Sequence, residues 1–413
     1  MYRALTLTLL LAACSRPAAG LQQPAEPPVQ PAGPVEQYAF FARLGNDTIS
    51  VERVSRSGNS LISDDVDRFP SVKLRHTEFE IAPDGRLTRM VMDIRTPSGA
   101  TPAERWRRVV AHFTNDSVMV TIRDSSGVTG RNFATEGALT VPHVSMLYSV
   151  IEFEIASAMR RAATAQRTEG GSLPFRQFYP DRDVGPRFVL HRGQVMPKDD
   201  GKVELQHDWL AGTGDVTVDS LGRMLTYSGQ HTTYKVSVTR SAELPDIATI
   251  GAAFAASERQ AGAKQLSVRD TARGIIGVAT IAIDYGRPLA RGRVLLGNVI
   301  EYDRIWRTGA NAATQLTTSA PITLAGLQLA AGTYTLWSAP HQGRIELIVN
   351  KESGQWGTEY DRTQDLGAAT LATETLTTPV EEFTISVVPT TPGHGKLVLE
   401  WGSFRWMAPI VAK

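Results

Sequence analysis

The stretch that decides the fold of the C-terminal part is Tyr285–Pro340, which reads YGRPLARGRVLLGNVIEYDRIWRTGANAATQLTTSAPITLAGLQLAAGTYTLWSAP. Its glycines, arginines and aromatic residues occur at irregular spacings, without the period of an amphipathic helix. Runs such as Thr314–Ser319 and Thr333–Ser338 lie between segments containing Gly, Pro or Asn, as antiparallel strands commonly do. The stretch therefore predicts short strands joined by specified turns, with a polar surface.

The same pattern continues on both sides of this stretch. The candidate strands are Ala279–Asp284, Arg293–Gly297, Thr314–Ser319, Thr333–Ser338, Arg344–Asn350, Glu382–Val388, Lys396–Trp401 and Phe404–Val411. Such a series favours an antiparallel β-sandwich or jelly-roll-like domain over residues 265–413. The Ala-rich segment 246–264, which reads DIATIGAAFAASERQAGAK, predicts a helical connector before that domain.

Several motifs in this part of the chain resemble one bacterial family. They are LSVRDTARG (266–274), DYGRP (284–288), RG (291–292), IWRTGANAAT (305–314), AGTYTLW (331–337), IVN (348–350) and GQWGTEYD (354–361). Together they are similar to the family catalogued as domain of unknown function 2911, over residues 265–411. The segment GNDTISVERVSRSG (45–58) also resembles the N-terminal module of some longer members. The resemblance implies an exported β-domain and supplies no catalytic residue.

Residues 36–245 show the pattern of an antiparallel sheet. Leu74–Ala82 and Arg86–Arg95 flank Pro83-Asp84-Gly85. Proline presets φ and glycine accepts a positive φ, so these segments predict a hairpin. Further adjacent hairpins favour a curved antiparallel sheet over parallel βαβ units. The fold class predicted for the whole chain is therefore mainly β.

Residues 145–166 break the β pattern of this N-terminal domain. Apolar residues recur there at steps of three and four, which predicts one long helix with Ser145 as its N-cap. A helix laid over a curved sheet could cover an apolar ligand cavity, or it could complete a filled core. Five methionines would suit the lining of such a cavity: Met90, Met92, Met119, Met146 and Met159.

The N-terminus has the pattern of an export signal. A short positive region precedes the apolar run Ala4–Leu10, and Leu11-Ala12-Ala13-Cys14 follows. A leucine three places before the cysteine makes this segment resemble a bacterial lipobox, in which the cysteine is lipidated. The prediction is a signal peptide over residues 1–13, lipidation at Cys14 and a Pro/Ala-rich tether over 14–35. Ser15, in place of Asp, favours the outer membrane, with the protein facing the periplasm.

The composition excludes several classes of function. The chain has 413 residues and a net charge of +1, which offers no general basic face for nucleic acid. It contains a single cysteine, so neither a disulfide nor a thiolate-metal site is expected within the chain. The sequence contains no P-loop, dinucleotide fingerprint or GxSxG elbow. We therefore predict no cofactor and lean against an enzyme.

A cluster of polar residues in the opening stretch is the candidate ligand site. It consists of Asp284, Arg287, Arg291, Arg307 and Asn311, and it lies beside several glycines. Glycine-bounded loops can turn backbone N–H groups toward one point, and arginine forks bind carboxylates, phosphates or sugar acids. The alternative is a structural network in which Asp284 pairs with an arginine.

Two other residue types could form a site. Three histidines could fall on neighbouring strands and ligate zinc, namely His191, His207 and His231, but they form no tight pair and we predict no metal site. Five tryptophans of the C-terminal domain could stack on sugars or fill the core: Trp306, Trp337, Trp356, Trp401 and Trp406.

The leading hypothesis is a lipid-anchored envelope protein with a non-catalytic binding or envelope-interaction role. Its sharper form is an apolar ligand, such as a lipid, in the N-terminal domain. One alternative is a hydrolase that acts on an envelope or carbohydrate substrate at the surface of Arg287, Arg307 and Asn311. A carbohydrate-binding module is the other alternative. The membrane, through the lipid, is the expected partner.

Overall fold

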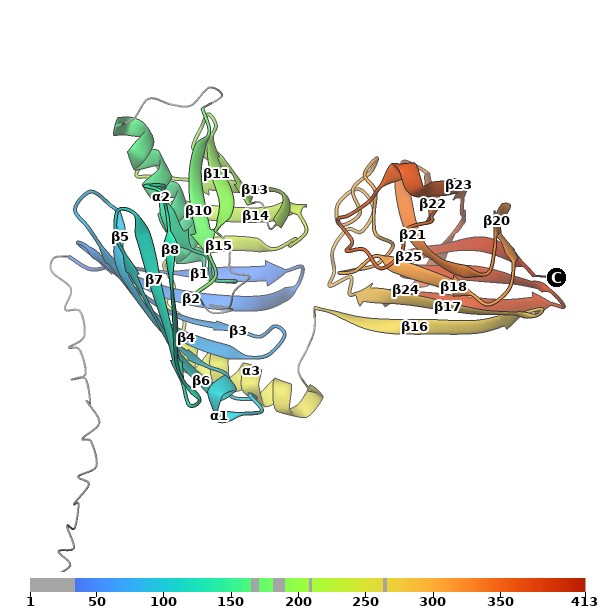
Figure 1. The fold of residues 1–413 in the computed structure, drawn as a ribbon, viewed down its shortest axis with the longest axis horizontal. Helices are drawn as coiled ribbons and strands as arrows, with labels where there is room; N and C mark the ends of the chain where they lie inside the picture. Colours follow the sequence, from blue (N-terminus) through green and yellow to red (C-terminus); the bar gives the residue numbers. More distant parts are fainter. Residues whose placement is uncertain (1–33, 165–170, 181–189, 208–209, 263–265, 413) are drawn as a thin grey trace, which may run out of the picture. The chain divides into compact units, whose positions relative to one another are not determined.

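The computed structural model describes residues 34–164, 171–180, 190–207, 210–262 and 266–412. The predicted signal peptide, the lipidation residue Cys14 and nearly all of the tether lie outside the described residues. Residues 31–413 belong to one compact unit, and every structural feature below lies within it. The described part is mainly β, as the sequence predicted (Figure 1).

The described N-terminal strands form one 15-stranded sheet in the order β8-β7-β6-β5-β4-β3-β2-β1-β15-β14-β13-β12-β11-β10-β9. Described neighbours pair antiparallel, except that β9 and β10 are parallel. The strands are β1 (Glu36–Leu44), β2 (Asp47–Ser57), β3 (Ser60–Asp67), β4 (Lys73–Ile81), β5 (Leu87–Arg95), β6 (Trp106–Phe113), β7 (Ser117–Asp124), β8 (Gly127–Ala134), β9 (Thr140–Pro142), β10 (Leu173–Phe178), β11 (His191–Pro197), β12 (Lys202–His207), β13 (Leu210–Val218), β14 (Met224–Thr232) and β15 (Ser237–Ser241). A short helix, α1 (Pro102–Arg105), precedes β6.

The predicted hairpin around Pro83-Asp84-Gly85 is present. Gly85 has a φ of 85°, and its N–H donates to the carbonyl of Ala82 at 2.8 Å. A residue with a side chain is strained in that conformation, which explains the glycine. The turn sets the register of β4 and β5, with Glu80 opposite Arg89.

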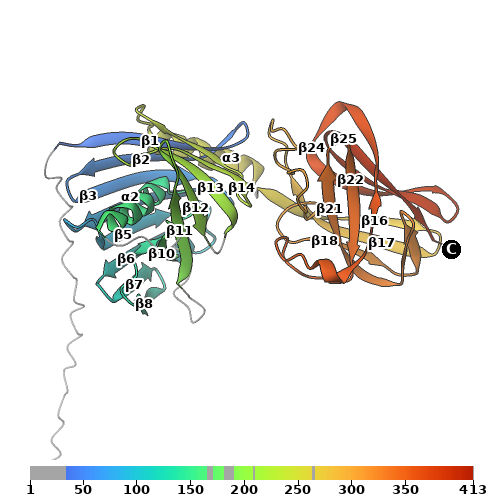
Figure 2. The same cartoon turned by 90° about the horizontal axis from the view of Figure 1, so that it is seen from above.

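The sheet curves around helix α2 (Tyr148–Thr164), which lies against its inner face (Figure 2). Ile151 and Ile155 of the helix belong to one apolar core with side chains from strands of the whole sheet. A cavity beside Val150 and Phe153 measures only about 10 Å³, roughly the space of one water molecule. At this point the helix and sheet form a filled core rather than a ligand chamber.

The methionines divide between the two sides of the sheet. Met90 and Met92 are fully buried in the core, and Met146 is nearly so. Met159 packs against the same core from the edge. Met119 is 49% exposed, so the idea that all five methionines line one cavity is wrong.

Helix α2 begins three residues later than predicted. The N-cap role expected of Ser145 is taken by Glu52 of β2, whose carboxylate accepts from the N–H groups of Tyr148 at 2.7 Å and Ser149 at 3.1 Å. A carboxylate at a helix N-terminus satisfies unpaired donors and complements the helix dipole. Glu52 lies 96 residues before Tyr148, so no local sequence pattern could indicate this cap.

A second buried charge cluster joins β3 and β4 beneath the start of α2. The guanidinium of Arg75 donates to Asp65 at 2.7 Å and to Asp67 at 2.7 Å, and all three side chains are at most 3% exposed. It also donates to the carbonyl of Ser145 at 3.1 Å. One cation shared by two buried carboxylates leaves excess negative charge in a medium of low dielectric. Burial accordingly raises the pKa of Asp65 to about 7.

This raised pKa predicts that the protein gains stability as the pH falls from about 7 to about 5. In that window Asp65 keeps its proton in the folded state. In the unfolded chain, where the pKa of this carboxyl is 3.8, the proton has been released. The gain from this group is up to about 1.4 kcal/mol per pH unit. Urea unfolding of Asp65→Asn at both pH values should show a flatter pH dependence. An unchanged slope would mean that Asp65 is ionised throughout.

The connector predicted at 246–264 contains helix α3 (Ile247–Ala261). Asp246 caps its first turn, and Gly262 ends it with a φ of 75°. The helix packs its apolar side on β2, β3 and β4, in a small core separate from that of α2. Its Glu258 accepts from the N–H of Val72 at 3.1 Å. The connector is thus part of the packing of the N-terminal sheet.

The described C-terminal strands form a six-stranded sheet facing a four-stranded sheet, which confirms the predicted sandwich. The larger sheet contains β16 (Ser267–Ile276), β17 (Ala279–Pro288), β18 (Thr314–Thr318), β21 (Gly332–His341), β22 (Arg344–Asn350) and β23 (Asp365–Thr370). The smaller contains β19 (Ile322–Leu324), β20 (Leu327–Leu329), β24 (Ala372–Thr391) and β25 (His394–Val411). A 3-10 turn, η1 (Arg362–Gln364), precedes β23.

An irregular segment, residues 289–313, joins β17 to β18. The strand predicted at Arg293–Gly297 is absent, because the N–H of Arg293 donates to Ala290 and that of Gly297 donates to Ile300, which closes local turns. Long segments without regular structure inside a packed domain are usually functional. We call this segment the long loop.

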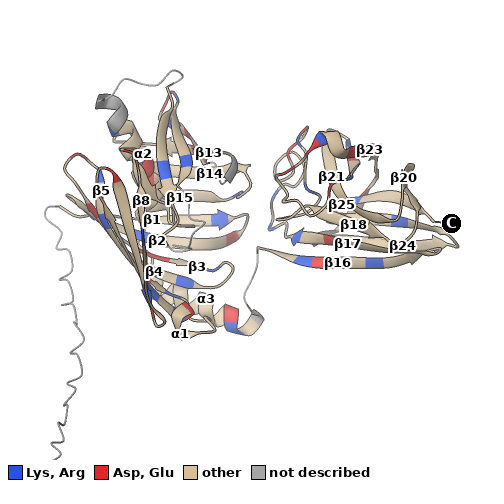
Figure 3. Cartoon of the chain, in the orientation of Figure 1, with Lys and Arg blue, Asp and Glu red and all other residues tan. Residues whose placement is uncertain are grey.

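Charges of both signs are interspersed along the strands of the described residues (Figure 3). None of the helices in those ranges is long and apolar enough to cross a membrane.

Candidate functional site

Two of the five predicted site residues are held in ion pairs along the edge of the sandwich. Asp284 pairs with Arg269 at 2.8 Å, not with an arginine of the predicted cluster. Arg287 pairs with Asp270 at 3.0 Å and with Glu382 at 3.0 Å. Both residues therefore form ion pairs of the kind that the structural alternative describes.

Arg291 fastens the long loop to the turn between β1 and β2. Its side chain is 4% exposed and pairs with Asp47, and its carbonyl accepts from the N–H of Asn46 at 2.9 Å. A Cβ on Gly45 would lie 2.2 Å from that carbonyl, so the contact requires glycine. The contacts of Arg291 thus hold the long loop against the turn between β1 and β2.

Arg307 and Asn311 are brought together at the far end of the long loop. The Nη1 of Arg307 donates to the backbone carbonyl of Asn311 at 3.1 Å. Among the described residues, no carboxylate lies within ion-pair distance of Arg307. Burial lowers its pKa, with no acidic neighbour to oppose that effect. Arg307 thus differs from Asp284, Arg287 and Arg291, each of which forms an ion pair.

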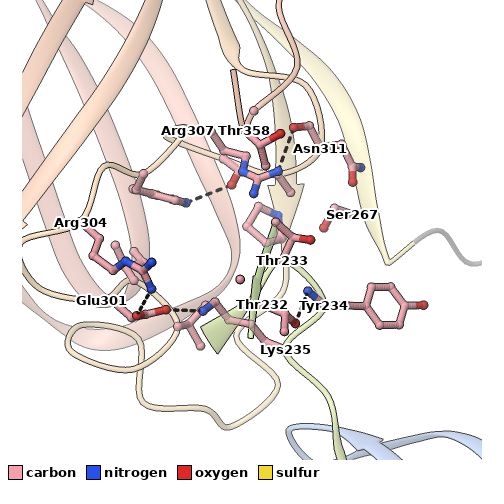
Figure 4. A pocket seen from close by; sticks show the side chains of 18 of the residues that line it. Thr232, Thr233, Tyr234, Lys235, Ser267, Glu301, Arg304, Arg307, Asn311 and Thr358 are labelled. Atoms are coloured by element: carbon pink, nitrogen blue, oxygen red, sulfur yellow. Dashed lines mark hydrogen bonds and ion pairs between the residues drawn. The ribbon is translucent and has the colours of Figure 1, made fainter. Parts of the chain in front are cut away.

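Arg307 and Asn311 line a cleft of about 490 Å³ (Figure 4). One wall is the segment 231–236, which includes the end of β14 and the residues just after it. The opposite wall is formed by residues 299–311 of the long loop and by 357–360. Figure 4 shows Thr358 and Asn311 close to the guanidinium of Arg307, with Lys235 and Glu301 further along the cleft.

The two walls are joined by polar contacts. Lys235 donates to Glu301 at 2.8 Å, and the side chain of Gln230 donates to the carbonyl of Asn298 at 2.6 Å. Arg304 approaches the other oxygen of Glu301 at 2.8 Å. Burial opposes ionisation of Glu301, but the bonds from Lys235 and Arg304 outweigh it and lower its pKa to about 2. Glu301 is therefore ionised and a weak base.

The lining of the cleft is positively charged. Its described lining residues include four cations and one carboxylate, which leaves an excess of three positive charges with histidine neutral: Lys235, Arg293, Arg304 and Arg307 against Glu301. A recess with low-dielectric walls and one sign of charge concentrates the field and attracts the opposite charge.

The backbone at Arg307 is constrained. Thr308 and Asn311 have φ values of 50° and 63°, in the left-handed region that β-branched residues such as threonine rarely enter. Thr314 holds this turn through a bond to the carbonyl of Thr308 at 2.7 Å, and Thr308 itself bonds Ser338 at 2.8 Å. Strained backbone conformations of this kind persist where the surrounding packing holds them in place, and they are common at binding sites.

Most of the tryptophans serve packing. Trp337, Trp401 and Trp406 are 1% exposed, and Trp306 stacks on Trp401 with ring centres 5.9 Å apart. The indole N–H of Trp306 donates to the carbonyl of Gly309 at 3.0 Å, which ties the strained turn to the core. Trp356 is 50% exposed and lies outside the cleft lining. These contacts favour the core interpretation over a row of sugar platforms.

The three predicted histidines have different surroundings. His207 is buried, with its Nε2 at 3.5 Å from Glu154. His231 is 54% exposed and lies on the cleft wall at 3.4 Å from Glu301. The ring of His191 lies 5.0 Å from that of Tyr179. Within the ranges that the structure describes, no three His, Cys, Asp or Glu side chains are placed to hold a metal ion.

Sequence reasoning missed one wall of the cleft. Thr232 and Lys235 lie in a segment that no motif connects with the long loop, and only folding brings the two segments together. The density of arginines in the long loop was the one available signal, and it pointed to the opposite wall.

Comparisons with known proteins add a family for part of the chain. No curated protein matches it. A crystal structure of a DUF1089 family protein from Pseudomonas aeruginosa is similar at 15% identity, with a TM-score of 0.33, over 45% of this chain and 92% of that one. Residues 267–410 match the family model described as Protein of unknown function (DUF2911). The C-terminal sandwich, with the long loop and the Arg307 wall of the cleft, is therefore the part of the chain that is similar to the DUF2911 family.

Proposed function

We propose that this protein is a non-catalytic, envelope-anchored lipoprotein that binds a small ligand in the cleft beside Arg307. The observation that carries the proposal is a recess of about 490 Å³ containing an arginine without an ion pair. That volume lies in the usual range of small-molecule sites, roughly 300–1,000 Å³. The strained, well-anchored turn at Thr308 holds the site in one conformation, which reduces the entropy lost on binding.

The anchoring part of the proposal is supported by the sequence. The run before Cys14 resembles a lipobox, and a Pro/Ala-rich tether follows it. A tether of that composition stays extended and would hold the folded part away from the bilayer. Export and attachment to the outer membrane, facing the periplasm, complete the proposal.

The cleft is better supported than the other candidate sites. The described cavity beside Val150 and Phe153 of α2 measures about 10 Å³, which is too small for an apolar ligand such as a lipid. The hydrolase alternative needs Arg287 beside Arg307. However, Arg287 lies on strand β17 and is paired there with Asp270 of β16 and Glu382 of β24. Glu301, the carboxylate among the described lining residues, has a pKa near 2 and would be a poor general base.

Filling the cleft with Thr358→Trp should abolish ligand retention without unfolding the protein. Thr358 is exposed and lines the cleft, so an indole there would occupy the recess. Native mass spectrometry of protein released from bacterial membranes should show an added small-molecule mass in the wild type. That mass should be lost from the variant.

The matched control is Thr373→Trp, an exposed threonine on β24 outside the cleft lining. It should retain the added mass, because it introduces the same indole elsewhere. Retention of the mass by both variants would rule out the cleft as the site. If the added mass were lost only from an N-terminal core variant such as Val150→Phe, the ligand site would lie in the N-terminal sheet instead.

A further inference from the structure

We infer that the ligand of this cleft carries an oxyanion, a carboxylate or a phosphate, and that this group pairs with Arg307. The inference rests on the proposed function and specifies the chemistry of its ligand.

Among the cations of the cleft, Arg307 has donors to spare. Lys235 and Arg304 are both satisfied by Glu301. Arg293 donates to the carbonyls of Leu289 and Ala290, at 2.6 and 3.0 Å. Arg307 makes one described hydrogen bond, to the carbonyl of Asn311. A guanidinium has five N–H donors in a planar fork, and that fork matches the two oxygens of a carboxylate or phosphate.

The orientation of this fork is set by the backbone around it. A Cβ on Gly357 would lie 2.4 Å from the Cδ of Arg307 and 2.4 Å from the carbonyl of Asn311. The stem of Arg307 therefore lies directly on the backbone of Gly357, and its head is fixed by Asn311. A guanidinium held in place before binding loses less side-chain entropy when a ligand arrives.

A second donor without an acceptor belongs to the same lining. Trp337 lines the cleft at 1% exposure, and its indole N–H has no hydrogen-bond acceptor among the described residues. An unpaired buried donor destabilises the fold, and an oxyanion acceptor would relieve that cost. The ring of Tyr360 lies 5.1 Å from that of Trp337 and lines the same cleft.

The charge of the recess agrees with this chemistry. Four cations and one carboxylate among the described lining residues disfavour a cationic ligand and attract an anion. Glu301 does not compete for Arg307, because it is already shared by Lys235 and Arg304. The geometry and the field therefore favour the same class of ligand.

The test is a set of titrations with benzoate, phenyl phosphate and uncharged benzyl alcohol, followed by tryptophan fluorescence and calorimetry. Benzoate or phenyl phosphate should bind saturably to the wild type, and the preference between them tells a carboxylate site from a phosphate site. Arg307→Gln should weaken that binding by about ten- to a hundredfold, and Arg307→Lys by less. Arg405→Gln is the control, since Arg405 pairs with Glu400 outside the cleft.

Three results would overturn the inference. One is the lack of saturable binding of either oxyanion up to about 10 mM. Another is equal weakening by Arg307→Gln and Arg405→Gln. The third is benzyl alcohol binding as tightly as the anions. If Thr358→Trp still abolishes binding of the neutral probe, the cleft remains the ligand site and only the oxyanion assignment fails. Thermal unfolding of each variant confirms that it is folded.

Discussion

Replacing Arg75 by methionine is expected to lower the free energy of unfolding by about 3–5 kcal/mol. Methionine fills the volume of the arginine stem but removes the cation shared by Asp65 and Asp67, which are both buried. The two carboxylates must then be protonated or remain unpaired in a medium of low dielectric. The bond from Arg75 to the carbonyl of Ser145, just before α2, is lost as well.

The control for this substitution is Arg53→Met on strand β2 of the same sheet. Arg53 pairs with Asp64 at 2.8 Å, but its side chain is 42% exposed. Exposed pairs contribute about 1 kcal/mol or less, so this variant should unfold close to the wild type in urea. If Arg75→Met is no less stable than Arg53→Met, the buried cluster does not stabilise the N-terminal sheet.

Replacing Trp401 by alanine is expected to cost about 3–5 kcal/mol and also to weaken the candidate site. Trp401 is 1% exposed and stacks on Trp306, and Phe383 contacts both rings at 5.2–5.8 Å between ring centres. Its removal leaves a cavity behind Trp306, whose indole N–H holds the carbonyl of Gly309. The turn that positions Arg307 should then become mobile.

Trp356→Ala is the matched control, because Trp356 is 50% exposed and lies outside the cleft lining. Its stability should change by about 0.5 kcal/mol or less. Urea unfolding and oxyanion titration of both variants check the two effects together. If Trp356→Ala abolished binding and Trp401→Ala did not, the exposed indole would be part of the site, as in a carbohydrate-binding module.

Local patterns were sufficient for most of the fold. The alternating burial of β4 and the glycine turn after it follow from residues close together in the chain. Helix α2 was recognised from its apolar period, but its first residue was misplaced because Glu52 on a distant strand caps it. The strand expected at Arg293–Gly297 failed for the opposite reason, since local turns there override a short apolar run.

The sequence by itself determined the mainly β class, the enclosed helix and the family of the C-terminal sandwich, because these depend on short-range periodicity and contiguous motifs. It also carries the prediction of export and lipidation at Cys14. The tertiary structure alone decided which polar residues are free to bind a ligand. Arg291 pairs with Asp47 across 244 positions, and Lys235 meets Glu301 across 66. Ion pairing depends on distances of a few ångströms in space, and sequence separation does not report them. Arg307 was one of five polar candidates in the chain, and folding left it as the arginine without a carboxylate.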